Sequence, residues 1–234
     1  ASSAASDVYK RQTVRMKGNK VAGVDYRIVP LADYEPDILY QKQVEAYYAD
    51  PELNRPVGRF GNAADKWGLA NWMAAAVADE ADADVGFYHI GGVRLDSIPA
   101  GGVSAAKVYG LEPFGTLVAE MEMTPAQMRR MIVSKYNDPV NAKEAHRIDL
   151  ISTTPYVIVT DAADNALDVQ FPKLREGRKY KVAVSDYIYR NYKDMEYTGG
   201  EITDEKVADI LLEELRDDSP LKIDNTPRQR VVRK

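Results

Sequence analysis

The chain has 234 residues, 45% of them hydrophobic, and its 31 Lys and Arg against 36 Asp and Glu give a net charge of −5. This size fits one large domain or one domain with extensions. The acidic balance argues against a nucleic acid polymer as partner, and no apolar run is long enough to predict a transmembrane segment. The absence of cysteine excludes disulfides, thiolate nucleophiles and cysteine-ligated zinc. Only His89 and His146 carry imidazoles, which argues against a binuclear metal site or a Ser-His-Asp triad within the chain.

The N-terminal part divides into two predicted segments. Residues 1–20 begin with "ASSAASDVYKRQ", which is small and polar without an apolar period, so we expect a disordered tail or residues left from cloning. Residues 21–56 are predicted to be a linker. Within it "VAGVDYRIVPL" alternates as an edge strand does, and "EPDILYQKQVEAYYADPEL" has helical spacing after a Pro-Asp start.

The first half of the next segment, residues 57–217, predicts alternating helices and strands. Asn62 is the expected N-cap of a helix in "NAADKWGLANWMAAAVADEAD", and "ADVGFYHI" is a short buried strand. Ser104 is expected to cap a short helix in "AAKVYGL", and "EPFGTLVAEMEM" runs from a turn into a strand. Thr124, Pro125 and Gln127 form a capping-box start for a further helix.

The second half is richer in strands. We expect three, in "RIDLISTTPYVIVTD", "ALDVQF" and "KYKVAVSDYIY", followed by a helix in "TDEKVADILLEELRD" that buries Val207, Ile210, Leu211 and Leu215. Residues 218–234 are basic at their end and are predicted to be a peripheral tail. The mixed order predicts an α+β fold with a mixed, partly antiparallel sheet and flanking helices.

Three short motifs place polar or aromatic groups at the ends of predicted strands, where sheets often bind ligands. They are the run from His89 to Arg94, Pro113-Phe114-Gly115, and Ser185-Asp186-Tyr187 with the following Asn191–Asp194. Each motif also has a purely structural interpretation. The glycine pair fits a bulge or tight turn, Phe114 a core side chain at a turn, Tyr187 a strand aromatic and His89 a histidine without a ligand.

Taken in order, these motifs resemble one family. The segments "WGLANWMAAAV", "HIGGVRLDSIPAGGVS", "EPFGTLVAEMEMTPAQM" and "RKYKVAVSDYIYRNYKDM" are similar to the C-terminal domain of the 5'-nucleotidase, UDP-sugar hydrolase and 2',3'-cyclic phosphodiesterase family. The upstream "DYRIVPLADYEPD" resembles the last strand of that family's catalytic domain and its interdomain linker. The resemblance covers about Val21 to Leu215.

The resemblance implies a nucleoside or nucleotide ligand whose base is sandwiched by two aromatic rings, and base stacking on an aromatic ring contributes about 1–3 kcal/mol per base. Arginine offers bidentate donors to the sugar or phosphate. Paired glycines let backbone amides approach the sugar. The positions implied to bind the substrate are Phe114 and Tyr187 as the rings, Arg94, the looser matches Arg59 and Asp194, and His89, Gly91 and Gly92 in the glycine-rich motif.

The chain departs from the family pattern at several of these positions. His89 stands where the family has asparagine, Ile90 where it has the first glycine, and Leu69 and Met73 replace an asparagine and an aspartate in the helix. The turn at Asn191–Asp194 carries an extra residue. With these changes, nucleoside binding by this chain could be altered, weakened or lost.

The resemblance also implies where the chemistry is carried out. Family members hydrolyse phosphate esters in a separate N-terminal metallophosphoesterase domain, which holds two divalent metals. We find no comparable motifs here, so we expect no catalytic residue and no cofactor in this chain, and the partner is a separate metallophosphatase domain or chain. An exported protein, periplasmic or surface-anchored as a lipoprotein, fits the family and the Ala/Ser start. Three hypotheses remain open: a substrate-specificity half, a stand-alone binding module, and a structural interaction domain with a degenerate pocket.

Overall fold

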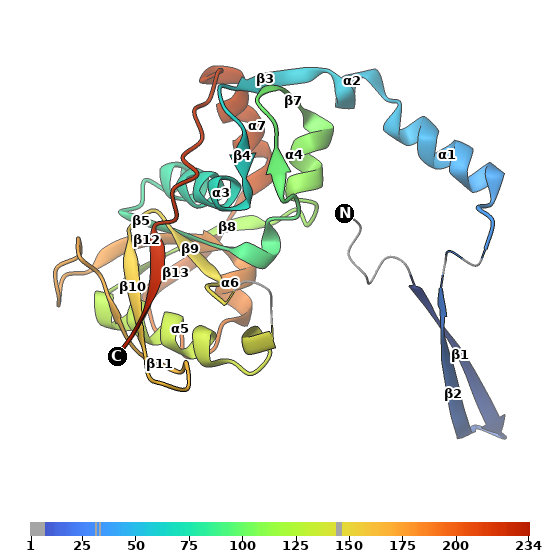
Figure 1. The fold of residues 1–234 in the computed structure, drawn as a ribbon, viewed down its shortest axis with the longest axis horizontal. Coiled ribbons are helices and arrows are strands. Elements are labelled where there is room, and N and C mark those ends of the chain that lie inside the picture. The colour runs from blue at the N-terminus through green and yellow to red at the C-terminus, as the bar shows by residue number, and fades with distance from the viewer. Residues whose placement is uncertain (1–7, 31, 33, 144–146) are drawn as a thin grey trace. The chain divides into compact units, whose positions relative to one another are not determined.

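A computed structural model describes residues 8–30, 32, 34–143 and 147–234 (Figure 1). The chain divides into two compact units, Ala1–Asp50 and Pro51–Lys234. The first seven residues of the expected tail, and His146, lie outside the described residues. No helix in the described ranges is long and apolar enough to cross a membrane.

The first unit contains a β-hairpin and one helix. Strand β1 (Val8–Lys17) pairs antiparallel with β2 (Lys20–Pro30), and α1 (Ile38–Tyr48) begins after Asp37, whose carboxylate accepts from the backbone N–H of Leu39. The expectation of an unstructured segment over residues 8–17 is therefore wrong. From Thr13 to Lys17 polar and apolar residues alternate, which is the period of a strand, and β2 supplies the partner for pairing.

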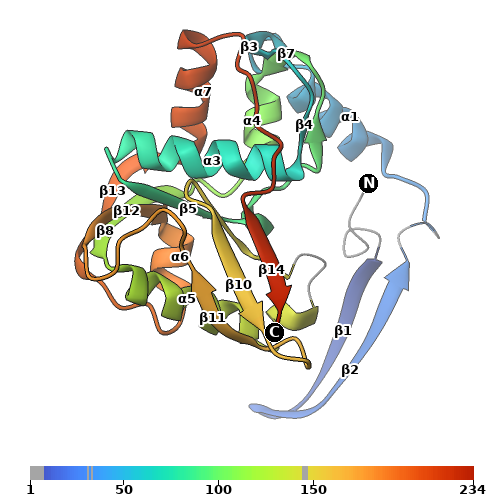
Figure 2. The same ribbon diagram turned by 60° about the vertical axis from the view of Figure 1, so that its left-hand side comes forward.

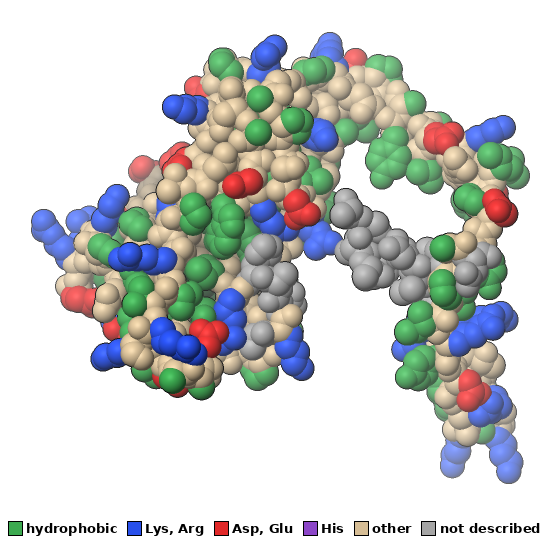
Figure 3. Space-filling model, in the orientation of Figure 1, with side chains coloured by type: hydrophobic (Ala, Val, Ile, Leu, Met, Phe, Trp, Pro, Cys, Tyr) green, Lys and Arg blue, Asp and Glu red, His purple; other side chains and the backbone are tan. Residues whose placement is uncertain are grey.

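The hairpin is amphipathic, and its apolar face is uncovered. One face carries six apolar side chains, each at least half exposed: Val14, Met16, Val21, Val24, Tyr26 and Ile28. A shift of register between Arg15 and Met16 lets Met16 pair with Val21, which keeps the apolar row in phase. The opposite face carries the Arg15–Asp25 ion pair. Figure 3 shows apolar side chains on the surface of this unit, and none of its described side chains is buried.

The second unit is built around a five-stranded sheet. Its strand order is β13 (Thr198–Lys206), β8 (Leu117–Met123), β12 (Tyr180–Ser185), β5 (Val85–His89) and β9 (Leu150–Ser152). The β12–β5 pair is parallel, whereas the other three pairs are antiparallel. The mixed, partly antiparallel sheet with flanking helices is confirmed.

Helices cover both faces of this sheet (Figure 2). A separate apolar core lies on each face. One core contains α3 (Lys66–Glu80), α4 (Ala105–Leu111) and α7 (Val207–Asp217), and the other contains α5 (Pro125–Asn137). Helix α3 lies directly on β5, because a Cβ at Gly86 would come within 2.1 Å of the Ala74 carbonyl oxygen. The sheet is thus buried on both faces, and the loops that follow its strands start from a well-packed core.

A smaller sheet has the order β11 (Ala166–Gln170), β10 (Tyr156–Thr160) and β14 (Gln229–Arg233). Two expectations are corrected here. The single strand expected in "RIDLISTTPYVIVTD" is two strands, β9 and β10, which belong to different sheets. Residues 218–234 are not peripheral, because β14 pairs parallel with β10 and belongs to the second unit.

Short elements complete the second unit. They are α2 (Pro51–Asn54), the pair β3 (Pro56–Phe60) and β7 (Gly101–Ser104), the pair β4 (Ala64–Asp65) and β6 (Ser97–Ile98), α6 (Asp186–Asn191), and the 3₁₀ helices η2 (Ile90–Gly92) and η3 (Asn141–Lys143).

The helix starts test the capping expectations directly. The Thr124–Gln127 capping box and the Ser104 cap are confirmed. The Asn62 cap is wrong: Asp65 caps α3, while Asn62 accepts from the backbone N–H of Ile223. The strand expected through "KYKVAVSDYIY" ends at Ser185, whose hydroxyl caps α6.

Asn71 holds the C-terminal segment against α3. It is 3% exposed, and its amide donates to the backbone oxygens of Asp224 (2.9 Å) and Thr226 (3.1 Å). Replacing it by alanine leaves both carbonyls without this donor, so Asn71→Ala should lower the free energy of unfolding by about 1–3 kcal/mol in urea titrations. The exposed Gln170→Ala on β11 is the control, and an equal effect of the two variants would contradict this role for Asn71.

Candidate ligand-binding site

A cavity of about 760 Å³ opens in the second unit where β5 and β12 end. Its walls come from the end of β5 with η2, the loop before β8, the C-terminal part of α5 and the helix α6. This volume lies within the range of about 300–1,000 Å³ that is usual for small-molecule sites.

Five of the eight residues expected at the site line this cavity: His89, Gly91, Arg94, Phe114 and Tyr187. The other three, Gly92, Arg59 and Asp194, do not. The three sequence motifs therefore meet at one place in the fold, although not every residue in them faces the cavity.

Phe114 is held outside the core by a turn built on a buried carboxylate. Glu112 is 1% exposed and accepts from the backbone N–H groups of Phe114 (3.2 Å) and Thr116 (3.3 Å), and from the Thr116 hydroxyl (2.6 Å). Gly115 takes a left-handed conformation with φ of 62°, which favours glycine. The Phe114 ring is left 60% exposed on the cavity wall. A core role for Phe114, one of the two interpretations of its motif, is excluded.

Tyr187 lies in the first turn of α6, not on a strand, and is 48% exposed. Its ring stacks on the His89 ring at a centroid distance of 4.4 Å and an angle of 22°. A second ring, Tyr192, meets it edge-on at 6.3 Å and 82°. One face of Tyr187 is thus covered by His89.

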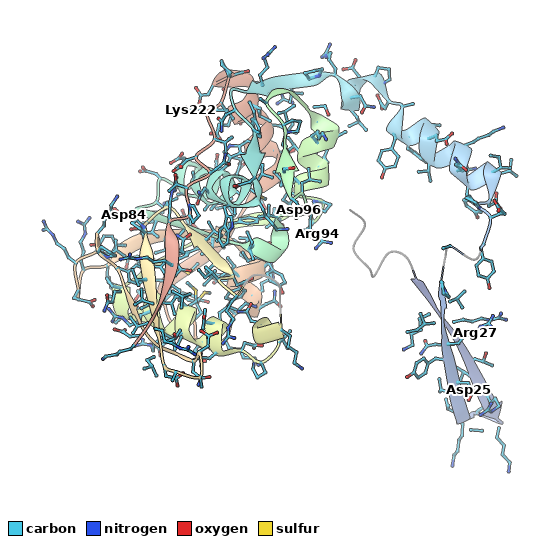
Figure 4. The ribbon with its side chains drawn as sticks, viewed as in Figure 1. Asp25, Arg27, Asp84, Arg94, Asp96 and Lys222 are labelled. Carbon is cyan, nitrogen blue, oxygen red and sulfur yellow. The ribbon has the colours of Figure 1, made fainter. Side chains whose placement is uncertain are left out.

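Four cationic side chains line the cavity, and they differ in their partners. Lys66 pairs with Asp96 outside the cavity, while Arg190 and Lys135 lie 3.2 Å and 3.7 Å from the carboxylates of Asp186 and Asp149. Arg94 follows η2 (Figure 4), and its guanidinium carbon lies 5.8 Å from the centre of the Phe114 ring. Within the described part of the chain, Arg94 has no carboxylate partner. Arg94 therefore places a guanidinium beside an exposed aromatic ring.

His89 is the last residue of β5, and its ring lies between two tyrosine rings. The Tyr88 ring is 5.3 Å away and the Tyr187 ring 4.4 Å, both inclined by 22°. The Nδ1 atom lies 3.4 Å from the Ser185 hydroxyl. Burial, together with the positive charge of Lys135, lowers the pKa of His89 to about 4. The imidazole is therefore neutral at pH 7 and adds no charge to the cavity.

The two glycines of the motif serve different purposes. A Cβ at Gly92 would lie 2.5 Å from Cε1 of His89, so Gly92 makes room for the histidine ring. A Cβ at Gly91 would meet nothing closer than 3.8 Å, and Gly91 faces the cavity. Of the two glycines, Gly91 lines the cavity, and the space beside Gly92 is taken by the His89 ring.

Arg59 and Asp194 lie elsewhere. Arg59 is an exposed residue of β3, paired with Gly102 of β7. Asp194 has a φ of 57° and accepts a hydrogen bond of 2.6 Å from the Ser134 hydroxyl. Their family positions were matched across altered spacing, and the local backbone takes them away from the cavity.

Sequence reasoning missed Lys135 and Asp149 at the cavity wall, which contact Tyr192 of the altered Asn191–Asp194 turn. The Tyr192 hydroxyl donates to the Asp149 carboxylate, and Lys135 lies 4.9 Å from the centre of the Tyr192 ring. Burial and the Asp149 carboxylate raise the pKa of Tyr192, which keeps the hydroxyl protonated as a donor. The inserted residue in the turn at Asn191–Asp194 was the only signal in the sequence.

The different spaces around the glycines give a direct test. Gly92→Ala should lower the free energy of unfolding by about 1–3 kcal/mol, because the new methyl group overlaps the His89 ring. Gly91→Ala is the matched control, with open space at its Cβ. Urea titrations of both variants compare them, and equal stability would show that the ring does not occupy this space.

The described residues contain no group of three or more His, Asp or Glu side chains that could hold a metal ion. No curated protein matches this chain in sequence.

Solved structures share the fold. The 5'-nucleotidase precursor from Thermus thermophilus matches with a TM-score of 0.68 and 16% identity, over 97% of this chain and 50% of that chain. A putative 5'-nucleotidase from Staphylococcus aureus, in complex with alpha-ketoglutarate, gives 0.65 and 14% over 97% and 51%. The Haemophilus influenzae NAD nucleotidase gives 0.62 and 14% over 86% and 42%. The chain thus spans about half the length of the structures it matches.

The family model described as "5'-nucleotidase, C-terminal domain" matches residues 52–198, which is more than half of the chain and includes all three motifs. On this match, the chain belongs to the 5'-nucleotidase C-terminal domain family.

Proposed function

We propose that this chain is the nucleoside- or nucleotide-recognition part of a 5'-nucleotidase-type hydrolase, and that the base lies between Phe114 and Tyr187. The observation that carries this proposal is the pair of half-exposed rings on one cavity. Beside one of them lies Arg94, which has no carboxylate partner among the described residues. Two half-exposed rings on the wall of one cavity support a flat ligand that covers both of them.

Stacking accounts for the affinity expected from such a clamp. A purine or pyrimidine offers two flat faces, and each aromatic contact with a base contributes about 1–3 kcal/mol. Phe114 is presented by a turn that Glu112 holds rigidly, so little conformational entropy is lost when a base binds. Tyr187 has one face on His89 and offers the other to the base.

Arg94 supplies the polar half of the recognition. A guanidinium donates two parallel hydrogen bonds to a phosphate or to vicinal hydroxyls. The other cations of the cavity, Lys66, Lys135 and Arg190, are each paired with a carboxylate, so Arg94 is the cation that we assign to the ligand. A nucleoside monophosphate satisfies both the rings and Arg94.

We place the hydrolytic reaction outside this segment, in a metallophosphoesterase half that holds the divalent metals. The relatives named above are about twice as long as this chain, and the described residues include no metal-binding group.

The exposed apolar face of the hairpin, residues 14–28, is the surface we assign to contact with that half. A two-stranded ribbon is at best marginally stable alone, and burying this row of side chains would stabilise it. An exported location, periplasmic or surface-anchored, completes the proposal on the family resemblance.

Calorimetric titration with AMP, adenosine and UMP tests the clamp. The unmodified chain should bind, and Phe114→Ala and Tyr187→Ala should each weaken binding about 5- to 150-fold, the equivalent of one lost base stack. Tyr109→Ala is the control, because Tyr109 is an exposed aromatic on α4 that does not line the cavity. Absence of binding by the unmodified chain would favour a structural interaction domain instead.

The same titration separates the role of Arg94 from that of the rings. Arg94→Gln should weaken AMP more than adenosine, because only AMP carries the phosphate that the guanidinium would pair with. A charge-assisted hydrogen bond contributes about 1.5–3 kcal/mol, so a loss of about 10- to 150-fold for AMP is expected. Equal losses for the two ligands would show that Arg94 binds the sugar or supports Phe114 and does not bind the phosphate.

A further inference from the structure

Three rings stand in a row at the cavity wall: Tyr88, His89 and Tyr187. The two outer rings are each inclined by 22° to the histidine, at 5.3 Å and 4.4 Å. These separations are typical of offset aromatic stacking. The row begins in the core, since Tyr88 is fully buried, and ends at the half-exposed Tyr187.

The middle ring is held more firmly than the outer one. The missing side chain of Gly92 leaves the space that Cε1 and Nε2 of His89 occupy, and Ser185 lies 3.4 Å from Nδ1. The buried Tyr88 ring stacks on it at a centroid distance of 5.3 Å. His89 is thus confined by its neighbours and by its place at the end of a central strand.

Tyr187, by contrast, depends on its neighbours for its orientation. It lies in the first turn of the short helix α6, and within the described part of the chain its ring contacts are the His89 face and the Tyr192 edge. A tyrosine ring at the surface without a stacking partner samples several rotamers, and ordering it would reduce the affinity for any base that stacks on it.

We propose that His89 is a positioning residue for the aromatic clamp: its ring backs Tyr187 and sets the plane against which the base stacks. This inference rests on the proposed function, and it gives a role to a residue that departs from the family asparagine. The His89 ring extends the clamp by one layer, so that the order is Tyr88, His89, Tyr187 and then the base.

Two variants of the full chain separate positioning from simple packing. His89→Ala removes the backing ring and should weaken AMP about 2- to 10-fold, the equivalent of one aromatic pair. His89→Phe keeps a flat ring but cannot make the contact with Ser185, and it should restore AMP binding to within about 2-fold of the unmodified chain.

A packing control is available in the same core. Val77 on α3 is fully buried and does not line the cavity. Val77→Ala should lower the melting temperature while leaving AMP affinity unchanged. If His89→Ala behaves in the same way, with lower stability and unchanged affinity, His89 only fills space and the proposal is overturned.

A spectroscopic measurement gives a second readout that does not depend on stability. The chain has two histidines, so in histidine-labelled protein the ring signal of His89 is assigned by its loss in His89→Phe. Tyr187→Leu should shift this signal, because the aromatic ring above it is gone. An unchanged His89 signal would overturn the stack.

The AMP titrations distinguish the proposed function from the positioning role of His89. If the unmodified chain binds none of AMP, adenosine and UMP, the proposed function is wrong. If it binds AMP and His89→Ala binds equally well, the function stands and the positioning role is wrong.

Discussion

The parallel pairing of β5 with β12 at the centre of the sheet is the constraint on which the site depends. Val184 lies opposite Phe87, so the two parallel strands end at nearly the same level. Their C-terminal ends bring His89 and Ser185 together at one end of the sheet. Strand β8 runs antiparallel to β12, so β8 begins at that same end of the sheet. The turn with Phe114, which precedes β8, therefore lies there too. The Leu117 backbone N–H donates to Asp186 across this junction. Three motifs far apart in sequence thus meet because of one strand register.

Much of this could be predicted from the sequence, and the failures have physical causes. Local signals such as the Thr124–Gln127 capping box depend on neighbouring residues alone, and they were confirmed. Tyr187 was expected on a strand because its β-branched and aromatic neighbours favour one, but the Ser185 hydroxyl begins a helix there. Strand β14 was missed because its pairing partner, β10, is far away in the sequence. At the site, the aromatic positions followed from motif order, whereas the Lys135–Tyr192 wall depends on tertiary packing.

Both the hairpin and the cavity expose apolar or aromatic side chains to solvent. The hairpin exposes an apolar row that a second layer would bury, and the cavity exposes two aromatic rings that a flat ligand would cover. Within a hydrolase of the proposed kind, the first would be met by the metal-binding half and the second by the substrate base. The domain would then contribute binding energy from a part of the substrate distant from the phosphate ester, which is how binding remote from a reacting group can serve catalysis.

The measurement that tests the central claim most directly is an isotope-filtered NOE experiment on the chain with AMP, using protein labelled in its Phe and Tyr rings. A base held between the two rings predicts contacts from the adenine protons to both Phe114 and Tyr187, each assigned by its loss in the corresponding alanine variant. Adenine contacts to neither ring, in a sample where AMP is bound, would contradict the clamp and place the nucleotide elsewhere.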